Sequence, residues 1–120
     1  MEIDFWDVVM SNEHVLSVSE FCQDVMEIRL NSCAYRSKSP LVLYIRLNES
    51  GELFLSDWGV TSDLVEEYGI PEDDLAKTAS KYGFMCGEYD ISKGGVSDST
   101  ISRMIDNYVN FVKEIGLVRE

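Results

Sequence analysis

The sequence has few of the residues on which small reactive or cross-linked proteins depend, with one histidine, two prolines and three cysteines in 120 residues. Cys22, Cys33 and Cys86 are odd in number and form no C-x-x-C pair, which indicates reduced thiols rather than a disulfide framework. The single histidine, His14, leaves one nucleophilic constellation, in which it activates Cys33 or Cys22 and an acid such as Asp57 orients it. No glycine elbow supports that arrangement, so we interpret the thiols as small apolar core residues and predict no catalytic residue.

Long apolar runs are also missing. The longest uninterrupted run covers residues 41–45, far short of the roughly 20 residues that a membrane-spanning helix needs. Glu2, Asp4 and Asp7 lie where a signal peptide would carry basic and then apolar residues. We therefore expect no membrane partner and a cytoplasmic location.

Basic residues are scarce, since 10 of them face 22 acids and leave a formal net charge of −12. Such a charge repels phosphate backbones, which argues against direct binding of nucleic acid, and attracts a basic protein. The acids that we predict to form a binding surface are Asp63, Glu66, Glu67, Glu72, Asp73 and Asp74. They lack the Asp-x-Asp-x-Asp-Gly spacing of a calcium loop, so we predict no metal and no cofactor here. Solvated acids at a helix start are the simpler interpretation.

A short basic island interrupts this acidity and forms a second candidate patch. It consists of Arg36, Lys38 and Arg46, with Tyr35 and Tyr44 beside them. These residues could hold an anion or an acidic partner. They could equally be a solvated strand edge whose cations prevent sheet-to-sheet pairing.

Composition and periodicity predict one domain over residues 1–120 with a core of its own. A short first helix stops near Ser11, and residues 14–24 fit a helix slightly better than a strand. Alternation then predicts three consecutive antiparallel strands, which begin at Met26, Leu41 and Leu53.

The remainder returns to helical periodicity after the third strand. A helix closed by Gly69 and a helix with Pro71 as its first residue precede a short hairpin over residues 84–92. Lys93-Gly94-Gly95 reads as a loop, and Ser97 or Asp98 as the cap of a long final helix. A broad apolar stripe from Ile101 to Ile115 marks this helix, and Gly116 closes it. The predicted fold class is α+β, a three-stranded antiparallel sheet plus a short hairpin packed against helices.

The stretch "LFLSDWGVTSDLVEEYG", residues 53–69, joins the third strand to a helix. Asp57 is suited to bond backbone amides two residues on, and Gly59 permits a positive φ. Thr61 or Ser62 would cap the helix, and Trp58 would pack over the bend as a lid. These residues predict a structural corner rather than a reactive centre.

The same stretch carries a resemblance. "LSDWGVTSDL", followed by "YGIPEDDL" and "KYGF", resembles the domain of unknown function 1828 family, small domains of bacteria, phages and prophages. The likeness covers roughly residues 15–118 and departs at "NSCAYRSKSPL", where the family often shows Thr-Pro-Phe. The resemblance implies a gene of phage, prophage or mobile-element origin, and it implies no defined chemistry.

Three functions remain open from these patterns. The first is a non-enzymatic protein-interaction module, in one form an inhibitor whose acidic surface imitates nucleic acid and occupies a host defence or nucleic-acid-processing protein. The second is a small-ligand-binding or enzymatic module in which Asp57, Trp58 and Arg46 line a pocket at the sheet corner. The third is a structural subunit of a toxin or restriction assembly, for which self-association is expected.

Overall fold

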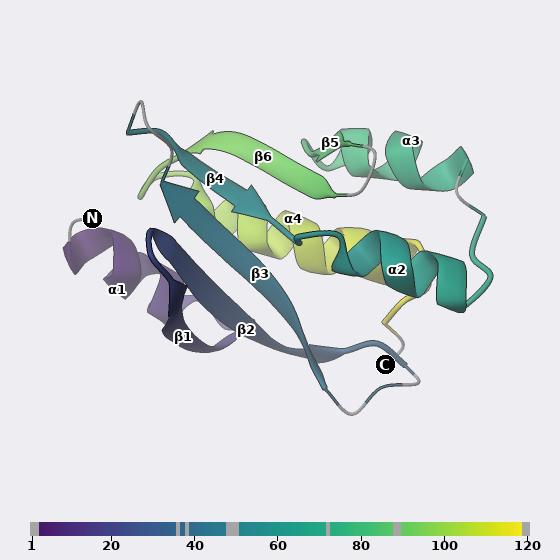
Figure 1. Cartoon of the computed structure of the whole chain (residues 1–120), viewed down its shortest axis with the longest axis horizontal. Helices are drawn as coiled ribbons and strands as arrows, with labels where there is room; N and C mark the ends of the chain where they lie inside the picture. The colour runs from purple at the N-terminus through teal and green to yellow at the C-terminus, as the bar shows by residue number, and fades with distance from the viewer. Residues whose placement is uncertain are drawn as a thin grey trace.

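The computed structural model describes residues 3–35, 37, 39–47, 51–71, 73–87 and 90–118, and the side chains of all of these except residues 3, 4, 47, 73 and 74. The described residues form an α+β fold of four helices and one six-stranded sheet (Figure 1). In chain order the elements are α1 (Ile3–Ser11), β1 (Val15–Cys22), β2 (Val25–Cys33), β3 (Pro40–Leu47), β4 (Leu53–Ser56), α2 (Val60–Glu67), α3 (Asp73–Lys81), β5 (Met85–Cys86), β6 (Ile91–Val96) and α4 (Ile101–Glu114).

The sheet is antiparallel at every pairing, in the order β1-β2-β3-β4-β6-β5. The α+β class predicted from the sequence is therefore confirmed, but the three-stranded sheet is wrong. β1 extends one edge of the predicted three strands, and β6 followed by β5 extends the other. The short hairpin is part of the same sheet because β6 pairs with β4.

The first strand, β1, replaces the helix that residues 14–24 slightly favoured. Its pairing with β2 shifts register between Val15 and Ser17 and again between Glu20 and Cys22. Each irregularity interrupts the alternation of inward and outward side chains, so the apolar residues do not repeat with a period of two. β1 forms because the regularly alternating strand β2 offers an edge to pair with, and the sequence of β1 alone does not indicate this pairing.

The last long strand, β6, contains the Lys93-Gly94-Gly95 segment that was predicted to be a loop. Glycine is unfavourable inside strands because it has no side chain to pack. Here Gly94 pairs with Phe54 of β4, and the register shifts between Leu53 and Phe54. The Phe54 ring lies so close to Gly94 that a larger residue would not fit there without a shift.

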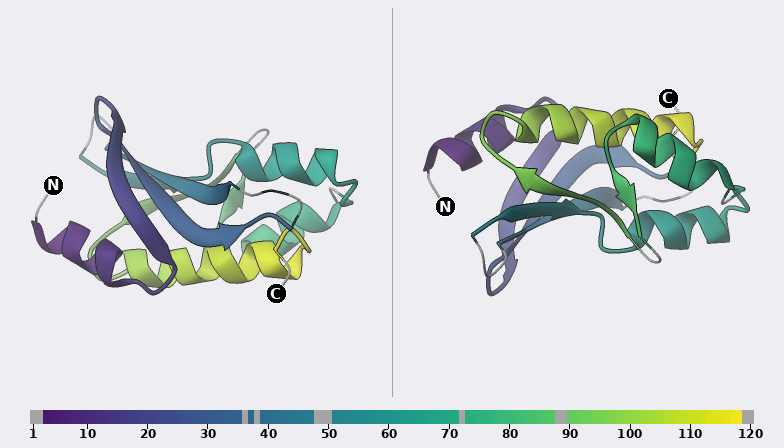
Figure 2. Two further views of the ribbon diagram at one scale, coloured as in Figure 1. Left: turned by 90° about the horizontal axis from the view of Figure 1, so that it is seen from below. Right: turned by 90° about the horizontal axis from the view of Figure 1, so that it is seen from above.

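One face of the sheet forms the core. Met26 pairs with Ile45, and Ile45 with Leu55, so the alternating apolar residues of β2, β3 and β4 share this face. Helix α4 lies along this face (Figure 2). Its buried side chains are those of Ile101, Met104, Ile105, Tyr108, Val109, Phe111 and Val112, which is the stripe that the sequence predicts.

The helix ends follow the predictions at their glycines but not at their caps. Gly69 and Gly116 have φ values of 70° and 89° and follow the ends of α2 and α4 as expected. The N-cap of α4 is Thr100 rather than Ser97 or Asp98, and no side chain caps it. Pro71 lies outside α3, which begins at Asp73. No helix in the described part of the chain is long and apolar enough to cross a bilayer.

The opposite face of β2, β3 and β4 is different. Figure 2 shows α1 and α4 on one side of these strands and no described helix over the other side. We call this second side the open face. The residues that point to it are Val25, Glu27 and Arg29 of β2, Tyr44 and Arg46 of β3, and Phe54 and Ser56 of β4.

Candidate functional site

The corner after β4 is built around the carboxylate of Asp57, whose side chain is fully buried. Asp57 Oδ1 accepts the N–H of Gly59 at 3.0 Å and of Ile91 at 2.9 Å, and Oδ2 accepts the N–H of Thr61 at 3.0 Å. One side chain thus closes the turn, satisfies the start of α2 and fastens β6 to β4. The predicted caps Thr61 and Ser62 do not act as caps, because Gly59 is the N-cap and Asp57 supplies the acceptor.

Burial is the main influence on ionisation at this corner. It raises the pKa of Asp57 above the usual aspartate value, and hydrogen bonds from Thr61, Ile91 and Gly59 act in the opposite direction. The Thr61 hydroxyl lies 2.8 Å from the hydroxyl of Tyr108, whose pKa is raised by burial and by the charge of Asp57. Asp57 therefore faces the core and not the open face.

Trp58 points the other way because of the same turn. Its φ is 53° and that of Gly59 is 87°, so two successive residues are left-handed. A left-handed residue other than glycine costs about 1 to 2 kcal/mol. The indole is 56% exposed. Trp58 does not cover the corner as the expected lid. Its ring lies on the open face and belongs to an aromatic wall formed with Tyr44 and Phe21.

Two rows of paired residues cross the open face below this wall. In the first, Tyr44 pairs with Ser56 and Ser56 with Ser92. The second row lies two residues away along each strand and consists of Val25, Arg46, Phe54 and Gly94. Because side chains in register share a face, residues from four strands meet here.

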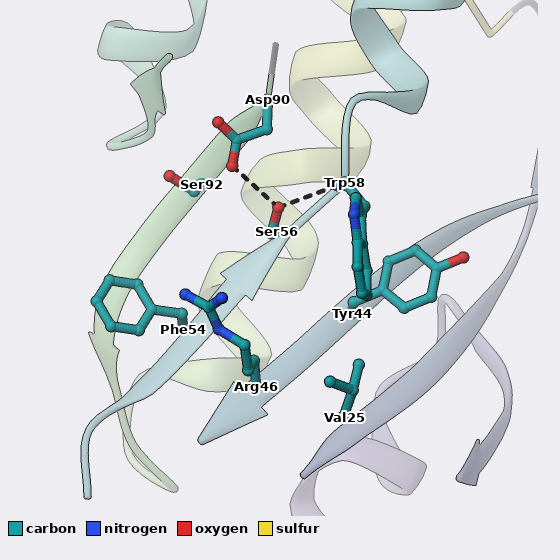
Figure 3. Close-up of a pocket in the computed structure, with 8 residues that line it drawn as sticks. All are labelled: Val25, Tyr44, Arg46, Phe54, Ser56, Trp58, Asp90 and Ser92. Atoms are coloured by element: carbon teal, nitrogen blue, oxygen red, sulfur yellow. Dashed lines mark hydrogen bonds between the residues drawn. The ribbon is translucent and has the colours of Figure 1, made fainter. Parts of the chain in front are cut away.

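The rows line a cavity of about 440 Å³ (Figure 3). This volume lies within the range of roughly 300 to 1,000 Å³ that is usual for small-ligand pockets. The lining residues are Val25, Tyr44, Arg46, Phe54, Ser56, Trp58, Asp90 and Ser92. Arg46 and Trp58 lie where the second hypothesis expected them, whereas Asp57 is absent from the wall and Asp90 is the acid that lines it.

The aromatic wall is a cluster of three rings from separate elements. The ring centroids of Tyr44 and Trp58 lie 5.1 Å apart, and Phe21 of β1 lies 5.2 Å from Tyr44 and 5.6 Å from Trp58. Phe21 is 51% exposed. Burial, with the negative charge of Glu27, raises the pKa of Tyr44, so its hydroxyl remains a hydrogen-bond donor at neutral pH.

The charged groups of the cavity are each held by a neighbour. The guanidinium carbon of Arg46 lies 5.8 Å from the centroid of the Phe54 ring, within cation–π range. A Cβ at Gly94 would lie 2.7 Å from Phe54 Cε1, so the glycine leaves the room that this ring occupies. On the other side, the Ser56 hydroxyl donates to Asp90 Oδ2 at 3.2 Å and accepts a hydrogen bond from the backbone N–H of Trp58 at 3.0 Å.

The acidic surface predicted from the sequence is only partly described. Asp63, Glu66 and Glu67 are exposed on α2. Asp73 and Asp74 lie on α3 without described side chains, and Glu72 lies outside the described residues. The three described carboxylates have an i, i+3, i+4 spacing and therefore share one side of the helix.

The fold separates the described members of the basic patch. Arg36 and Lys38 lie outside the described residues. Tyr35 packs on Tyr68 with 4.9 Å between ring centroids and lines a second, more open depression, whereas Tyr44 and Arg46 line the cavity. The two tyrosines thus belong to different sites.

The described residues bring together only part of the nucleophilic constellation. His14 and Cys33 both line the second depression, and His14 Nε2 lies 3.7 Å from Asp106 Oδ1. Asp57 is bound to backbone amides at the β4–α2 corner, separated from β1 by two strands. Within the described chain, no three histidine, cysteine or acidic side chains are grouped to hold a metal ion.

Several lining residues were missed from the sequence. The alternation of β3 and β4 could have placed Phe54 and Ser56 beside Arg46, since the turn between the strands sets the register. Asp90 and Ser92 had no comparable signal, because their place depends on the pairing of β6 with β4.

Comparison of the chain with protein-family models, with curated proteins and with solved structures gives no match. The resemblance to the domain of unknown function 1828 family thus stays a prediction from "LSDWGVTSDL" and the motifs after it.

Proposed function

We propose that this protein is a non-enzymatic binding module that takes a small ligand into the cavity of the open face. The carrying observation is the cavity itself, where aromatic rings and a few polar groups from four strands and the β4–α2 corner converge. Ligand sites have this composition, because apolar walls supply contact area and sparse polar groups fix orientation. The strained backbone of Trp58 supports the same interpretation, since strain of this kind gathers at functional positions.

Binding rather than catalysis is favoured by the chemistry of the lining. The eight lining residues that the structure describes include no histidine or cysteine. Asp57, the buried acid next to the cavity, has both oxygens engaged by backbone amides. A proton acceptor so occupied is suited to holding a turn, not to taking protons from a substrate.

Fragment binding followed by amide chemical shifts tests this function. With a library of planar fragments, we expect shifts that concentrate at residues 44–46, 54–58 and 90–92. Trp58→Ala should abolish these shifts. Leu16→Ala removes a large exposed side chain of β1, away from the cavity lining, and should not abolish them. Shifts scattered over the surface, or equal losses in both variants, would refute the cavity as the binding site.

A second candidate is the protein-interaction module with an acidic surface. The specific observation is the shared side of Asp63, Glu66 and Glu67 on α2, which presents three exposed carboxylates together. We propose a basic or nucleic-acid-binding protein as the partner, which would meet these charges in place of phosphates. Salt should weaken such a complex because exposed charges are screened.

The test for this candidate is a pull-down from host lysate at low and high salt. The variant with Asp63→Asn, Glu66→Gln and Glu67→Gln should lose a partner that wild type keeps at low salt. A control with the same change of charge, Glu13→Gln, Glu20→Gln and Asp24→Asn, removes exposed acids elsewhere and should retain it. Equal losses in the two variants would mean that net charge, not this surface, attracts the partner.

A further inference from the structure

Arg46 in the cavity forms no ion pair with an acid of the described residues. No carboxylate in the described part of the chain lies within ion-pair distance of Arg46, although acids outnumber bases by 22 to 10 in the sequence. By contrast, Arg29 on the same face pairs with Glu27 at 2.9 Å, and Lys81 pairs with Glu114 at 2.7 Å. Among the described residues, the contact given for Arg46 is its stacking on Phe54, and no described acid engages its N–H groups, which suit an anion.

A second charged group, Asp90, lines the same cavity and has the opposite sign. Asp90 Oδ2 accepts the Ser56 hydroxyl, and no described residue donates a hydrogen bond to Asp90 Oδ1. Figure 3 shows Arg46 and Asp90 on either side of Ser56, with the Trp58 and Tyr44 rings beside them. The cavity is therefore bipolar, with one cation and one anion beside the same two aromatic rings.

From this arrangement we infer that the ligand is a small aromatic zwitterion of the amino-acid class. Its carboxylate meets the guanidinium of Arg46, its ammonium group meets Asp90, and its ring packs against Trp58 and Tyr44. This inference rests on the proposed small-ligand function and narrows it.

Ligands with one charge fit less well for an electrostatic reason. A carboxylate alone would leave Asp90 without a cation in a partly desolvated site, and an ammonium group alone would leave Arg46 without an anion. Both charges occur next to one ring in a free aromatic amino acid. A residue at either end of a peptide has only one of the two.

Calorimetry with three probes that share one side chain tests the inference. They are L-phenylalanine, N-acetyl-L-phenylalanine, which keeps only the carboxylate, and L-phenylalanine amide, which keeps only the ammonium group. The last two also represent the C-terminal and N-terminal residues of a peptide. Hydrogen bonds to charged groups are stronger than those between neutral groups, so L-phenylalanine should bind at least about tenfold more tightly than either analogue.

Two variants assign the charges separately. Arg46→Gln should remove the preference for L-phenylalanine over its amide and leave the preference over the N-acetyl compound. Asp90→Asn should do the reverse. Arg29→Gln, a change on the same face outside the cavity lining, is the matched control and should leave all three dissociation constants unchanged.

The outcomes separate this inference from the function on which it rests. If either analogue binds as tightly as L-phenylalanine, or if only uncharged planar fragments bind in the cavity, the zwitterion is wrong and the small-ligand function stands. If neither the probes nor any fragment binds there, both are wrong.

Discussion

The two faces of the sheet are made by alternate residues of the same strands, yet they differ in what covers them. On the inner face Leu43, Ile45 and Leu55 are fully buried under α4. On the open face Tyr44, Arg46 and Phe54 remain partly or largely accessible. One face therefore contributes most of the stability, and the other is available for a ligand. Changes on the two faces should separate loss of folding from loss of binding.

The largest difference is expected between two phenylalanines. Phe111 of α4 is fully buried, and Phe111→Ala should lower the free energy of unfolding by about 4 kcal/mol, the usual cost of emptying such a site. Phe21 on the open face is 51% exposed, and Phe21→Ala should cost less than about 1 kcal/mol. Urea unfolding of both variants measures this, and similar losses would mean that the open face is covered in solution.

The next effect concerns the corner that separates the faces. Asp57→Ala should lower the free energy of unfolding by about 3 kcal/mol, because the N–H groups of Gly59, Thr61 and Ile91 lose their acceptor. Asp63→Ala, an exposed acid on the following helix, should change it by less than about 0.5 kcal/mol. Thermal or urea unfolding gives both numbers. A stable Asp57→Ala protein that had lost only ligand binding would make Asp57 a binding residue.

A smaller and more selective effect is expected at Gly94. Gly94→Ala places a Cβ against the Phe54 ring, so the ring and the Arg46 that stacks on it must move. Overpacking of this kind costs about 1 to 3 kcal/mol, and we expect the lower end because Phe54 is not fully buried. Calorimetry should show weaker binding of L-phenylalanine. Adding Phe54→Leu to make room should recover stability but not affinity, and recovery of both would mean that Phe54 does not position Arg46.

The left-handed backbone at Trp58 predicts that two variants at this position differ in free energy of unfolding by about 1 kcal/mol. Trp58→Gly and Trp58→Ala both remove the indole, but only glycine relieves the left-handed backbone at φ 53°. The glycine variant should therefore unfold at the higher urea concentration, and both should lose ligand binding. Equal stability of the two variants would show that the turn relaxes without cost.

The subtlest contrast is between two carboxylates with opposite pKa shifts. Burial raises the pKa of Asp57, so the folded protein holds this proton to higher pH than the unfolded chain does, and the contribution of Asp57 to stability falls as pH rises from its ordinary value to the raised one. Hydrogen bonds from Lys81 and Tyr82 lower the pKa of Glu114, whose contribution is therefore present above its ordinary pKa and is lost as pH falls through the lowered value.

Urea unfolding between pH 3 and 7 tests this contrast. The stability of wild type minus that of Asp57→Asn should decrease with rising pH across the window of Asp57. The same difference for Glu114→Gln should increase across the window of Glu114. Parallel slopes would mean that the hydrogen bonds to Asp57 outweigh its burial.

Much of the fold follows from local pattern, and the exceptions have identifiable causes. The alternation in β2 and β3 and the apolar stripe of α4 each report their own buried face, so these elements were predicted in place. Register shifts made β1 unrecognisable as a strand from its sequence, and Gly94 and Gly95 did the same for β6. Both strands form because a well-patterned neighbour offers an edge to pair with, which no local window of sequence contains.

The candidate site shows the same division. Arg46 and Trp58 were expected near a corner pocket, and the structure places both in the lining. The acid was assigned to Asp57, because local sequence cannot tell which of two carboxylates turns inward. Asp90, 33 positions further along the chain by residue number, reaches the cavity through the pairing of Ser92 with Ser56.

The sequence by itself determined the order of most elements, the inner face of the central strands and the bend at Asp57, since these depend on residues a few positions apart. Only the tertiary structure decided that the sheet has six strands and that residues from four of them enclose a bipolar cavity. The physical reason is that strand pairing joins distant segments through backbone hydrogen bonds, and the register of those bonds sets which side chains meet.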